Sequence, residues 1–355
     1  MISDLIKPVL FKALYGSWEV TNALAMDKGP RTNGYTALLP VPADLPVFLQ
    51  IALKSLLTQD QKHLAEILVI PDVPSDDFRV AFRKLTEGIS LPGLRLVEMN
   101  RKDMVVGRLY RTPNVYYFLQ ILNGMSHARS AHVLFHDADL FLFSKDFLKR
   151  HYEAFLDKHV SVLGVDRRSI VRLEEHRHIV ATWEMITSLE WLMRFKPYEH
   201  RGHKHFVRGR LVNFDSTLFP QFLTDPGEVG INKEYEQDEF LHFSFVISIY
   251  RLFCKSRGPF EDKYFKLLLI RSLIDALGDV GWTYSVPSMK DLVGALAGTD
   301  DKVSYAELET RKNYDTFRLN FERLIRSGIL GTEAGSTMRE RIRPFDERFA
   351  WTLER

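Results

Sequence analysis

The chain has 355 residues, of which 45% are hydrophobic and 26% are charged. This composition can bury a large core and excludes a disordered, fibrous or disulfide-stapled protein; the length allows about two domains or one large α/β domain with additions. Lysine and arginine (48) nearly balance aspartate and glutamate (46). The net charge of +2 therefore creates no field that gathers polyanions, and we expect no nucleic-acid partner.

Few features indicate the compartment. The single cysteine, Cys254, cannot form an intramolecular disulfide, and its apolar neighbours predict a buried, inert thiol in a reducing compartment. The N-terminus lacks the uninterrupted apolar run of a cleaved signal, and the longest strongly apolar stretch, residues 240–250, is shorter than the ~20 residues of a membrane-spanning helix. We expect a soluble, cytoplasmic protein. The apolar spacing in residues 5–14 predicts a helix that packs on its own domain or, as the less favoured alternative, rests peripherally on a membrane.

Strands and helices alternate through the first half of the chain. Residues 35–41 form an apolar run typical of a buried strand, residues 45–59 have helical spacing, and residues 66–72 form a second strand that ends in turn-forming residues. The same reasoning predicts further helices at 78–86, 115–129 and 146–157, and further strands at 94–98, 131–136 and 159–166. This order predicts an α/β fold with a mostly parallel sheet and helices on both faces.

The second half is less regular. Residues 167–178 and 198–205 are dense in charge and histidine, and we expect the site rather than the scaffold there. Helices are predicted at 236–253, 262–277 and 305–327, and a last strand at 282–287. The predicted domains are an N-terminal helical segment (1–30), a main domain with a donor-binding half (31–166) and an acceptor half (167–290), and a helical C-terminal extension (291–355).

Acidic residues follow two of the predicted strands. Asp72 ends the second strand, and Asp137 and Asp139 follow the apolar run of the fourth. In open α/β sheets ligands bind beyond the carboxyl ends of the strands. Two carboxylates in an Asp-x-Asp bend are hard oxygen ligands for Mn²⁺ or Mg²⁺, and such a cation also binds a diphosphate. Because the motif follows an apolar strand, we favour this interpretation over a solvated turn.

Several segments resemble glycosyltransferase family 2, whose members have the GT-A fold. They are residues 35–42, 54–60, 66–72 and 133–139, together with Gly124 and Ala128. Residues 136–140 are also similar to the family 7 galactosyltransferases. The resemblance extends well over residues 35–165 and faintly over 205–255. It implies a metal-dependent, inverting hexosyltransferase that moves a sugar from a nucleotide-diphosphate sugar to a hydroxyl acceptor. The acceptor would be a glycan, a lipid-linked molecule or a small molecule, as in polysaccharide biosynthesis.

The resemblance also implies roles for individual residues. Asp72 would contact the nucleotide base, Asp137 the ribose or the metal, and Asp139 the metal itself. Pro40, in the first matching segment, joins these residues in the donor site.

An inverting transfer needs a carboxylate that takes the proton of the acceptor hydroxyl. Asp238, with Glu239 as the second choice, is the candidate, because both precede the apolar helix predicted from residue 240. The alternative is that these acids only complement the dipole of a helix start. His242, four residues after Asp238, would share its helical face and orient it, complete the metal shell, or be a buried structural histidine.

Other residue types in the second half allow two interpretations each. His200, His203 and His205 lie among cations without a cysteine, which favours a solvated or phosphate-contacting loop over a zinc site. Asp215 ends a strand-like run and is a candidate for contact with the donor or acceptor sugar. Three aromatic residues suit either sugar stacking or the core, the core being the commoner case: Trp183, Trp191 and Tyr198.

Two other functions fit the same pattern less well. A sugar nucleotidyltransferase would need a glycine-rich phosphate loop, which residues 39–43 lack. A non-catalytic GT-A-fold protein that binds sugars or nucleotides remains as an alternative, because Gln237 stands where these families carry an acid.

Overall fold

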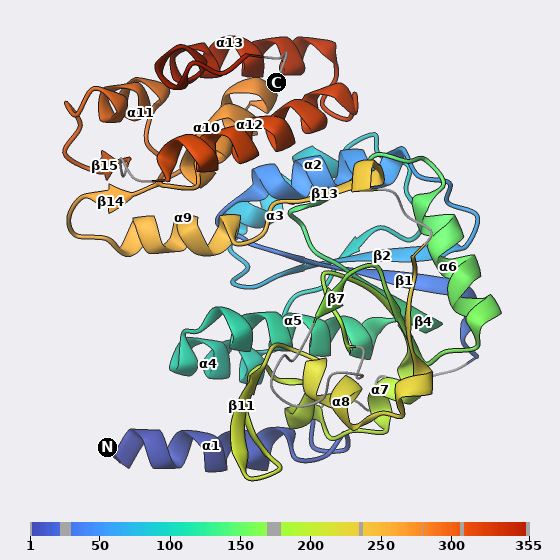
Figure 1. Ribbon diagram of the computed structural model, residues 1–355. Coiled ribbons are helices and arrows are strands. Elements are labelled where there is room, and N and C mark those ends of the chain that lie inside the picture. The colour runs from blue at the N-terminus through green and yellow to red at the C-terminus, as the bar shows by residue number, and fades with distance from the viewer. Residues whose placement is uncertain are drawn as a thin grey trace.

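The computed structural model describes residues 2–21, 30–168, 179–233, 237–278, 280–305 and 309–352. Its centre is a seven-stranded sheet of order β12-β6-β9-β4-β1-β2-β3 (Figure 1). The neighbours in β4-β1-β2-β3 are parallel, as are β12 and β6, and only β9 runs antiparallel to its neighbours. The mostly parallel α/β sheet predicted from the sequence is therefore confirmed. Its strands are β1 (Thr32–Val41), β2 (Leu64–Pro71), β3 (Arg95–Leu96), β4 (Ser130–His136), β6 (Val162–Gly164), β9 (Glu184–Ser188) and β12 (Val229–Ile231).

The central strands are apolar on both sides because helices cover both faces of the sheet. From Tyr35 to Val41 every residue of β1 is buried, and the two faces of the strand belong to separate clusters. The helices α2 and α5 lie on opposite sides of the sheet (Figure 1). Leu39 belongs to the cluster that contains residues of α2, whereas Leu38 belongs to the cluster that contains residues of α5. The helices of this half are α2 (Pro46–Leu57), α3 (Asp76–Thr86), α4 (Arg101–Tyr110), α5 (Pro113–His127) and α6 (Phe147–Lys158).

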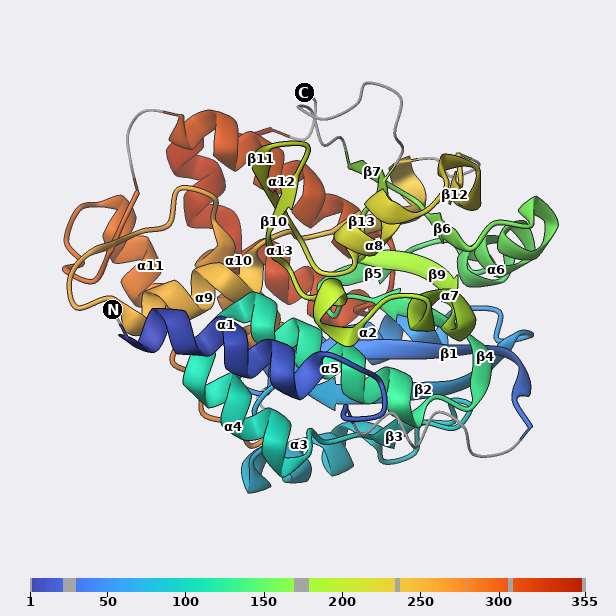
Figure 2. The same cartoon turned by 90° about the horizontal axis from the view of Figure 1, so that it is seen from below.

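The first helix, α1 (Ile2–Tyr15), packs on its own domain. It lies beside α4 and α5 (Figure 2). Phe11 and Tyr15 are buried against Phe118 of α5, and the Tyr15 hydroxyl donates a hydrogen bond to Asp103 of α4. These contacts support the favoured interpretation of this segment. Within the described residues, no helix combines the length and the apolar character needed to cross a bilayer.

The C-terminal helices cover the α2 side of the molecule (Figure 1). A cluster of buried aromatic rings, including Phe265, Tyr314 and Phe345, joins them to one another. Arg323 donates a hydrogen bond to the carbonyl oxygen of Phe240 at 3.0 Å and so connects these helices to the strand β13. The helices are α10 (Lys266–Leu277), α11 (Met289–Leu296), α12 (Thr310–Arg326) and α13 (Thr332–Phe349).

The region between β9 and α11 contains short elements and most of the differences from the predictions. Instead of one helix over 236–253, the chain forms β13 (Phe240–His242) and α9 (Val246–Lys255), and no strand forms at 282–287. Cys254 is exposed rather than buried. The remaining elements are β5 (Leu140–Leu142), β7 (Arg167–Arg168), β8 (Ile179–Val180), α7 (Leu189–Met193), β10 (His203–Val207), β11 (Arg210–Phe214), α8 (Leu218–Leu223), β14 (Phe260–Glu261) and β15 (Val303–Ser304), with short 3₁₀ helices at Pro197–His200, Pro226–Glu228 and Gln237–Glu239.

Candidate active site

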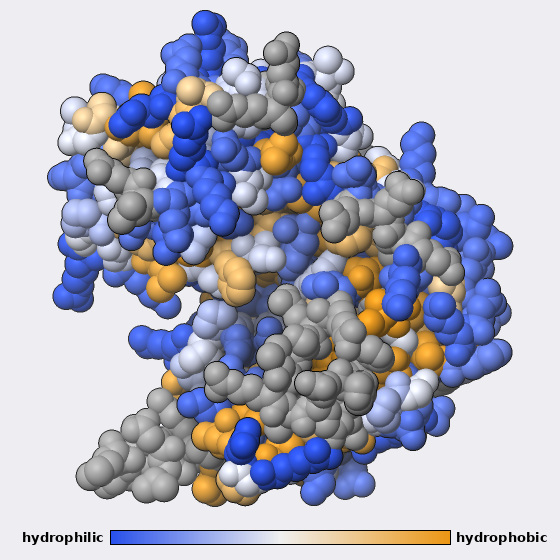
Figure 3. All heavy atoms as spheres, in the orientation of Figure 1, coloured by the Kyte–Doolittle hydropathy of each residue, from blue (hydrophilic) through white to orange (hydrophobic). Residues whose placement is uncertain are grey.

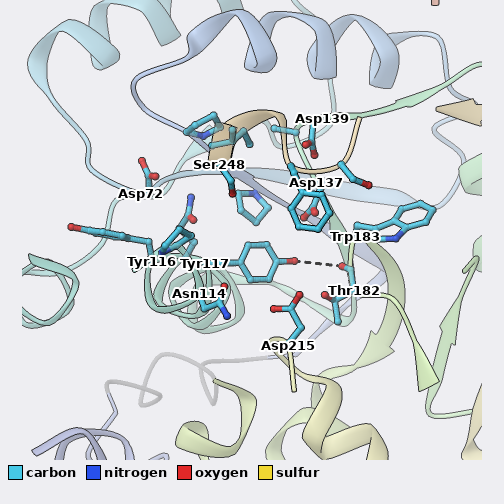
Figure 4. Close-up of a pocket in the computed structure, with 18 of the residues that line it drawn as sticks. Asp72, Asn114, Tyr116, Tyr117, Asp137, Asp139, Thr182, Trp183, Asp215 and Ser248 are labelled. Carbon is cyan, nitrogen blue, oxygen red and sulfur yellow. Dashed lines mark hydrogen bonds between the residues drawn. The ribbon is translucent and has the colours of Figure 1, made fainter. Parts of the chain in front are cut away.

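A pocket lies at the carboxyl ends of β1, β2 and β4, between the helices α5 and α9 (Figure 4). Its cavity has a volume of about 260 Å³, and the space-filling view shows the hollow on this side of the molecule (Figure 3). Gln120 of α5 closes the floor by donating hydrogen bonds to the carbonyl oxygens of Val41 and Ile70. The predicted donor residues Pro40, Asp72, Asp137 and Asp139 all line this pocket, together with His242, Trp183 and Asp215.

Asp137, Asp139 and His242 form the group in the pocket that is best suited to hold a metal ion. One ligand atom from each lies within 4.8 Å of the others, and the His242 Nε2 atom is 3.4 Å from Asp139 Oδ1. His242 reaches this position because β13 pairs antiparallel with β5, not because of a helix: His242 lies opposite Leu140, and Phe243 N–H donates to the Asp139 carbonyl. Trp183 stacks on the His242 ring at 4.7 Å.

The electrostatics of this group favour a cation. The Oδ1 atom of Asp137 is buried and has no hydrogen-bond partner among the described residues. Its burial and the neighbouring charge of Asp139 raise the pKa of Asp137 to about 7, although His242 opposes the shift. Two close carboxylates, one with an unsatisfied oxygen, fit the oxygen-rich site that Mn²⁺ or Mg²⁺ requires.

The strand β9 fixes this group from behind. The Asp137 N–H donates to the carbonyl oxygen of Trp183, just before β9 begins. One residue earlier, His136 Nδ1 lies 2.7 Å from Glu184 Oε2, and both side chains are fully buried. Burial raises the pKa of Glu184, while His136 opposes the shift.

Asp72 lies at the other end of the pocket and is held by several groups. Its Oδ1 atom accepts hydrogen bonds from the N–H groups of Ala43 and Val73. Its Oδ2 atom pairs with Arg251 of α9, which also binds Asp44 at 2.8 Å. Burial raises the pKa of Asp72, and the charge of Arg251 opposes this shift.

Comparisons with known proteins agree with this geometry. Residues 46–212 match the family described as glycosyl transferase family 2. This part of the chain, just under half of its length, is therefore similar to a family 2 glycosyltransferase domain. The GT-A resemblance and the enzyme class predicted from the sequence are thereby confirmed.

Among solved structures, the galactosyltransferase LgtC in complex with donor and acceptor sugar analogs is 14% identical, with a TM-score of 0.36; the match covers 46% of this chain and 62% of LgtC. S. aureus TarS 1–349 is 12% identical, with a TM-score of 0.36, over 90% of this chain and 93% of TarS. Glucosyl-3-phosphoglycerate synthase from Mycobacterium tuberculosis is 13% identical, with a TM-score of 0.33, over 59% of this chain and 71% of that protein. A comparison with curated proteins gives no match.

The predicted general bases, Asp238 and Glu239, lie away from this pocket. Neither Asp238 nor Glu239 is among its lining residues. The Asp238 side chain is 89% exposed and lies 3.5 Å from Arg323, while Glu239 pairs with Arg150 of α6. Since the chain forms a 3₁₀ turn and then β13 here, Asp238 and His242 do not share a helical face. Glu236 lies outside the described residues.

Asp215 is the carboxylate that lies across the pocket from Asp137 and Asp139 (Figure 4). It follows β11, it is exposed, and Figure 4 shows it on the opposite side of Tyr117 from Asp137. Tyr117 donates to the carbonyl oxygen of Thr182 at 3.4 Å. Burial, followed by the charges of Asp137 and Asp215, raises the pKa of Tyr117, which therefore remains a neutral phenol.

The histidine-rich segment supports Asp215 rather than forming a metal site. His200 is buried and its Nε2 atom lies 2.8 Å from the Leu192 carbonyl oxygen, while its own carbonyl accepts a hydrogen bond from Thr217 N–H. Gly202 allows the close approach, since a Cβ atom there would lie 2.9 Å from the Ser216 nitrogen. His205 stacks on Phe219.

The three aromatic candidates fall into different environments. Trp183 lines the pocket, as described above. Trp191 is fully buried and donates its indole N–H to Thr224, so it belongs to the core. Tyr198 lies under the Lys12 ammonium group of α1, outside the pocket.

Sequence reasoning missed Tyr117 and Arg251 as residues of the pocket. Both lie on helices with apolar spacing, where a tyrosine or a single arginine looks like a boundary residue. The sequence contains one signal, which is the position of Arg251 on an otherwise apolar turn of α9. An arginine in such a stretch indicates a nearby acidic partner, because a buried guanidinium needs one.

Proposed function

We propose that the protein is a metal-dependent, inverting glycosyltransferase that moves a sugar from a nucleotide-diphosphate sugar to a hydroxyl acceptor. The observation that carries this proposal is the group of Asp137, Asp139 and His242 at the strand ends of a domain similar to the family 2 glycosyltransferases. Residues 31–166 would bind the donor and residues 167–290 would supply Asp215, His242 and the acceptor side.

In this mechanism Asp137, Asp139 and His242 would hold Mn²⁺ or Mg²⁺ near the diphosphate of the donor. The cation supplies neutralisation of the negative charge that develops on the leaving diphosphate. Asp72 and Pro40 line the end of the pocket that would hold the nucleoside, and Arg251 keeps the Asp72 carboxylate oriented. Trp183, stacked on His242, restricts the orientation of the imidazole.

We further propose Asp215 as the general base, in place of Asp238 and Glu239. Inversion requires the base on the face of the sugar opposite the leaving group. Asp215 is exposed to the cavity and faces the metal-binding group, which is the arrangement that this step needs. Asp238 and Glu239 instead pair with arginines outside the pocket. Tyr117 is a neutral hydroxyl between the two acidic sites, and it would donate to a donor or acceptor oxygen by exchanging its 3.4 Å hydrogen bond to the Thr182 carbonyl for one to the substrate.

The proposal is tested by a thermal-shift panel of nucleoside diphosphates and nucleotide sugars, each with and without Mn²⁺. UDP sugars come first, because TarS 1–349 has been solved with UDP-GlcNAc. A ligand present at 100 times its dissociation constant should stabilise the fold by about 2.7 kcal/mol. Failure of every nucleotide to shift the melting temperature with Mn²⁺ would contradict the proposal.

A further inference from the structure

The hairpin of β10 and β11 exposes large apolar side chains that nothing in the proposed reaction uses. Phe206 is 75% exposed and Leu211 is 62% exposed. They lie directly opposite each other in the antiparallel pair, so their side chains stand together on one face of the hairpin. Single exposed apolar residues are common on protein surfaces, but a paired aromatic and aliphatic residue is a small patch.

The turn fixes this arrangement. Arg208 and Gly209 both have positive φ values, 48° and 76°, which is the pattern of a two-residue hairpin turn of type I′. This turn sets the register that pairs Phe206 with Leu211. The opposite face of the hairpin is already used: Val207 and Phe214 are buried in a cluster with the helix α8. The outward position of the apolar pair is therefore built into the fold.

The charged residues of the hairpin itself are all of one sign. Between residues 203 and 214 the chain has Lys204, Arg208 and Arg210, all exposed, and no acidic residue. The two histidines add no charge at neutral pH, since burial lowers the pKa of His203 and lowers that of His205 to about 4. In Figure 3, hydrophobic and hydrophilic groups lie side by side over the lower part of the molecule, where Figure 1 places this hairpin.

We propose that the β10–β11 hairpin docks the protein on an anionic lipid surface, with Phe206 and Leu211 entering the interface. Lys204, on the same face of the hairpin, and the exposed Arg210, beside the turn, would contact the headgroups. Apolar insertion combined with cations is the chemistry that such a surface selects. A second copy of this chain would bring the same cations against one another, which disfavours a dimer through this face. The peripheral contact considered for the first helix is thus assigned to a different element.

The placement also relates docking to the site. Phe206, Leu211 and Asp215 are all exposed. Leu211 lies in β11 and Asp215 directly follows this strand, an even number of residues after Leu211, and residues at such a spacing point to the same side of a strand. Docking through the hairpin would bring the Asp215 side of the pocket close to the lipid headgroups. This consequence, unlike the docking itself, rests on the proposed function.

The test is sedimentation of the full chain with vesicles of equal parts phosphatidylglycerol and phosphatidylcholine, compared with phosphatidylcholine alone. We expect binding to the anionic vesicles that weakens with added salt. The double substitution Phe206→Ser with Leu211→Ser should reduce the partition coefficient at least about tenfold, because two large apolar groups are removed. Arg210→Glu should reduce it by roughly fivefold for each unit of charge changed.

Matched controls lie on α12, which Figure 1 places at the opposite end of the molecule. Leu319 is 52% exposed and Lys312 is exposed, so Leu319→Ser and Lys312→Glu make the same chemical changes elsewhere and should leave binding unchanged. Melting temperature and Mn²⁺-dependent nucleotide binding report on the fold and on the site independently. Three results would overturn the proposal: no binding by the parent protein, equal loss in the α12 variants, or a hairpin-dependent dimer in size-exclusion chromatography without vesicle binding.

Discussion

Asp137 and Asp139 follow β4, a central strand whose last four residues are buried, whereas Asp215 follows β11, an edge of a two-stranded hairpin outside the main sheet. The first two carboxylates are held by the core and by β5, β9 and β13. The third is held by its short loop, through one backbone hydrogen bond to His200 and the close approach at Gly202. The proposed donor side is thus part of the scaffold, while the proposed acceptor side is attached to it through the hairpin. Nucleotide binding and sugar transfer should therefore respond separately to substitution.

The largest effect is expected on the scaffold side. Asp139→Ala should abolish Mn²⁺-dependent nucleotide binding and leave the fold intact, because the main-chain bond from Phe243 to residue 139 does not need the side chain. The measurement is the thermal shift with each nucleotide sugar that stabilises the parent protein. Asp157→Ala, an exposed acid on α6, is the control and should behave like the parent. An undiminished Mn²⁺-dependent shift in the Asp139 variant would remove this residue from the metal site.

On the attached side, Asp215→Asn should separate binding from chemistry. The amide keeps the size of the side chain but removes its basicity, so transfer should fall by about 10²–10⁴-fold while nucleotide binding persists. Initial rates and thermal shifts on the same preparations check both halves of this expectation. A loss of nucleotide binding equal to the loss of rate would instead assign Asp215 to the donor.

The pH dependence of metal binding sharpens the comparison. The pKa of Asp137 is raised to about 7, and a metal ligand must be deprotonated, so Mn²⁺ affinity should fall about tenfold per unit below pH 7 and level off above it. In the metal-free protein, the free energy of unfolding should fall as pH rises, whereas Mn²⁺ affinity should increase. The reason is that the Asp137 carboxyl binds its proton more tightly in the folded state than in the unfolded state, so this group lowers stability as pH rises from about 4 to 7. Calorimetric titration between pH 5.5 and 8 measures the pH dependence of Mn²⁺ affinity. This range extends about one unit or more to either side of the pKa. An Asp137→Asn variant should lose the slope.

The smallest effect is expected for Asp238→Asn. Its side chain is 89% exposed and its partner Arg323 lies at 3.5 Å, so the substitution should change the free energy of unfolding by no more than about 0.5 kcal/mol and the transfer rate only a few-fold. Urea unfolding and initial rates provide the comparison. A hundredfold loss of rate in this variant, with Asp215→Asn near the parent, would restore the original assignment of the base.

The sequence predicted the donor side well because its signals are local. Apolar runs without alternation indicate buried parallel strands, and the acids that follow them must lie at one edge of the sheet. Asp72, Asp137 and Asp139 were found in this way, and all three line one pocket. Their individual roles stay predictions.

The acceptor side was harder to predict because non-local pairing decides it. The apolar residues 240–250 satisfy a helical pattern, yet three of them pair with β5 across about a hundred residues of chain and form a strand. No local propensity contains that information. His242 was a candidate metal ligand from the sequence, but for the wrong structural reason, and Asp215 was only one of several polar strand ends.

The hydrogen bond from Arg323 to the Phe240 carbonyl has a consequence for engineering. Phe240 begins the strand that ends in His242, so the C-terminal helices brace the same three residues that set the imidazole against Asp139. A chimera that exchanged α12 and α13 for those of another protein would therefore need an arginine at this position of its new helix. Without it, we expect the graft to fold and yet to weaken the proposed cation site, although the seam before α12 lies about 70 residues after His242 in the chain.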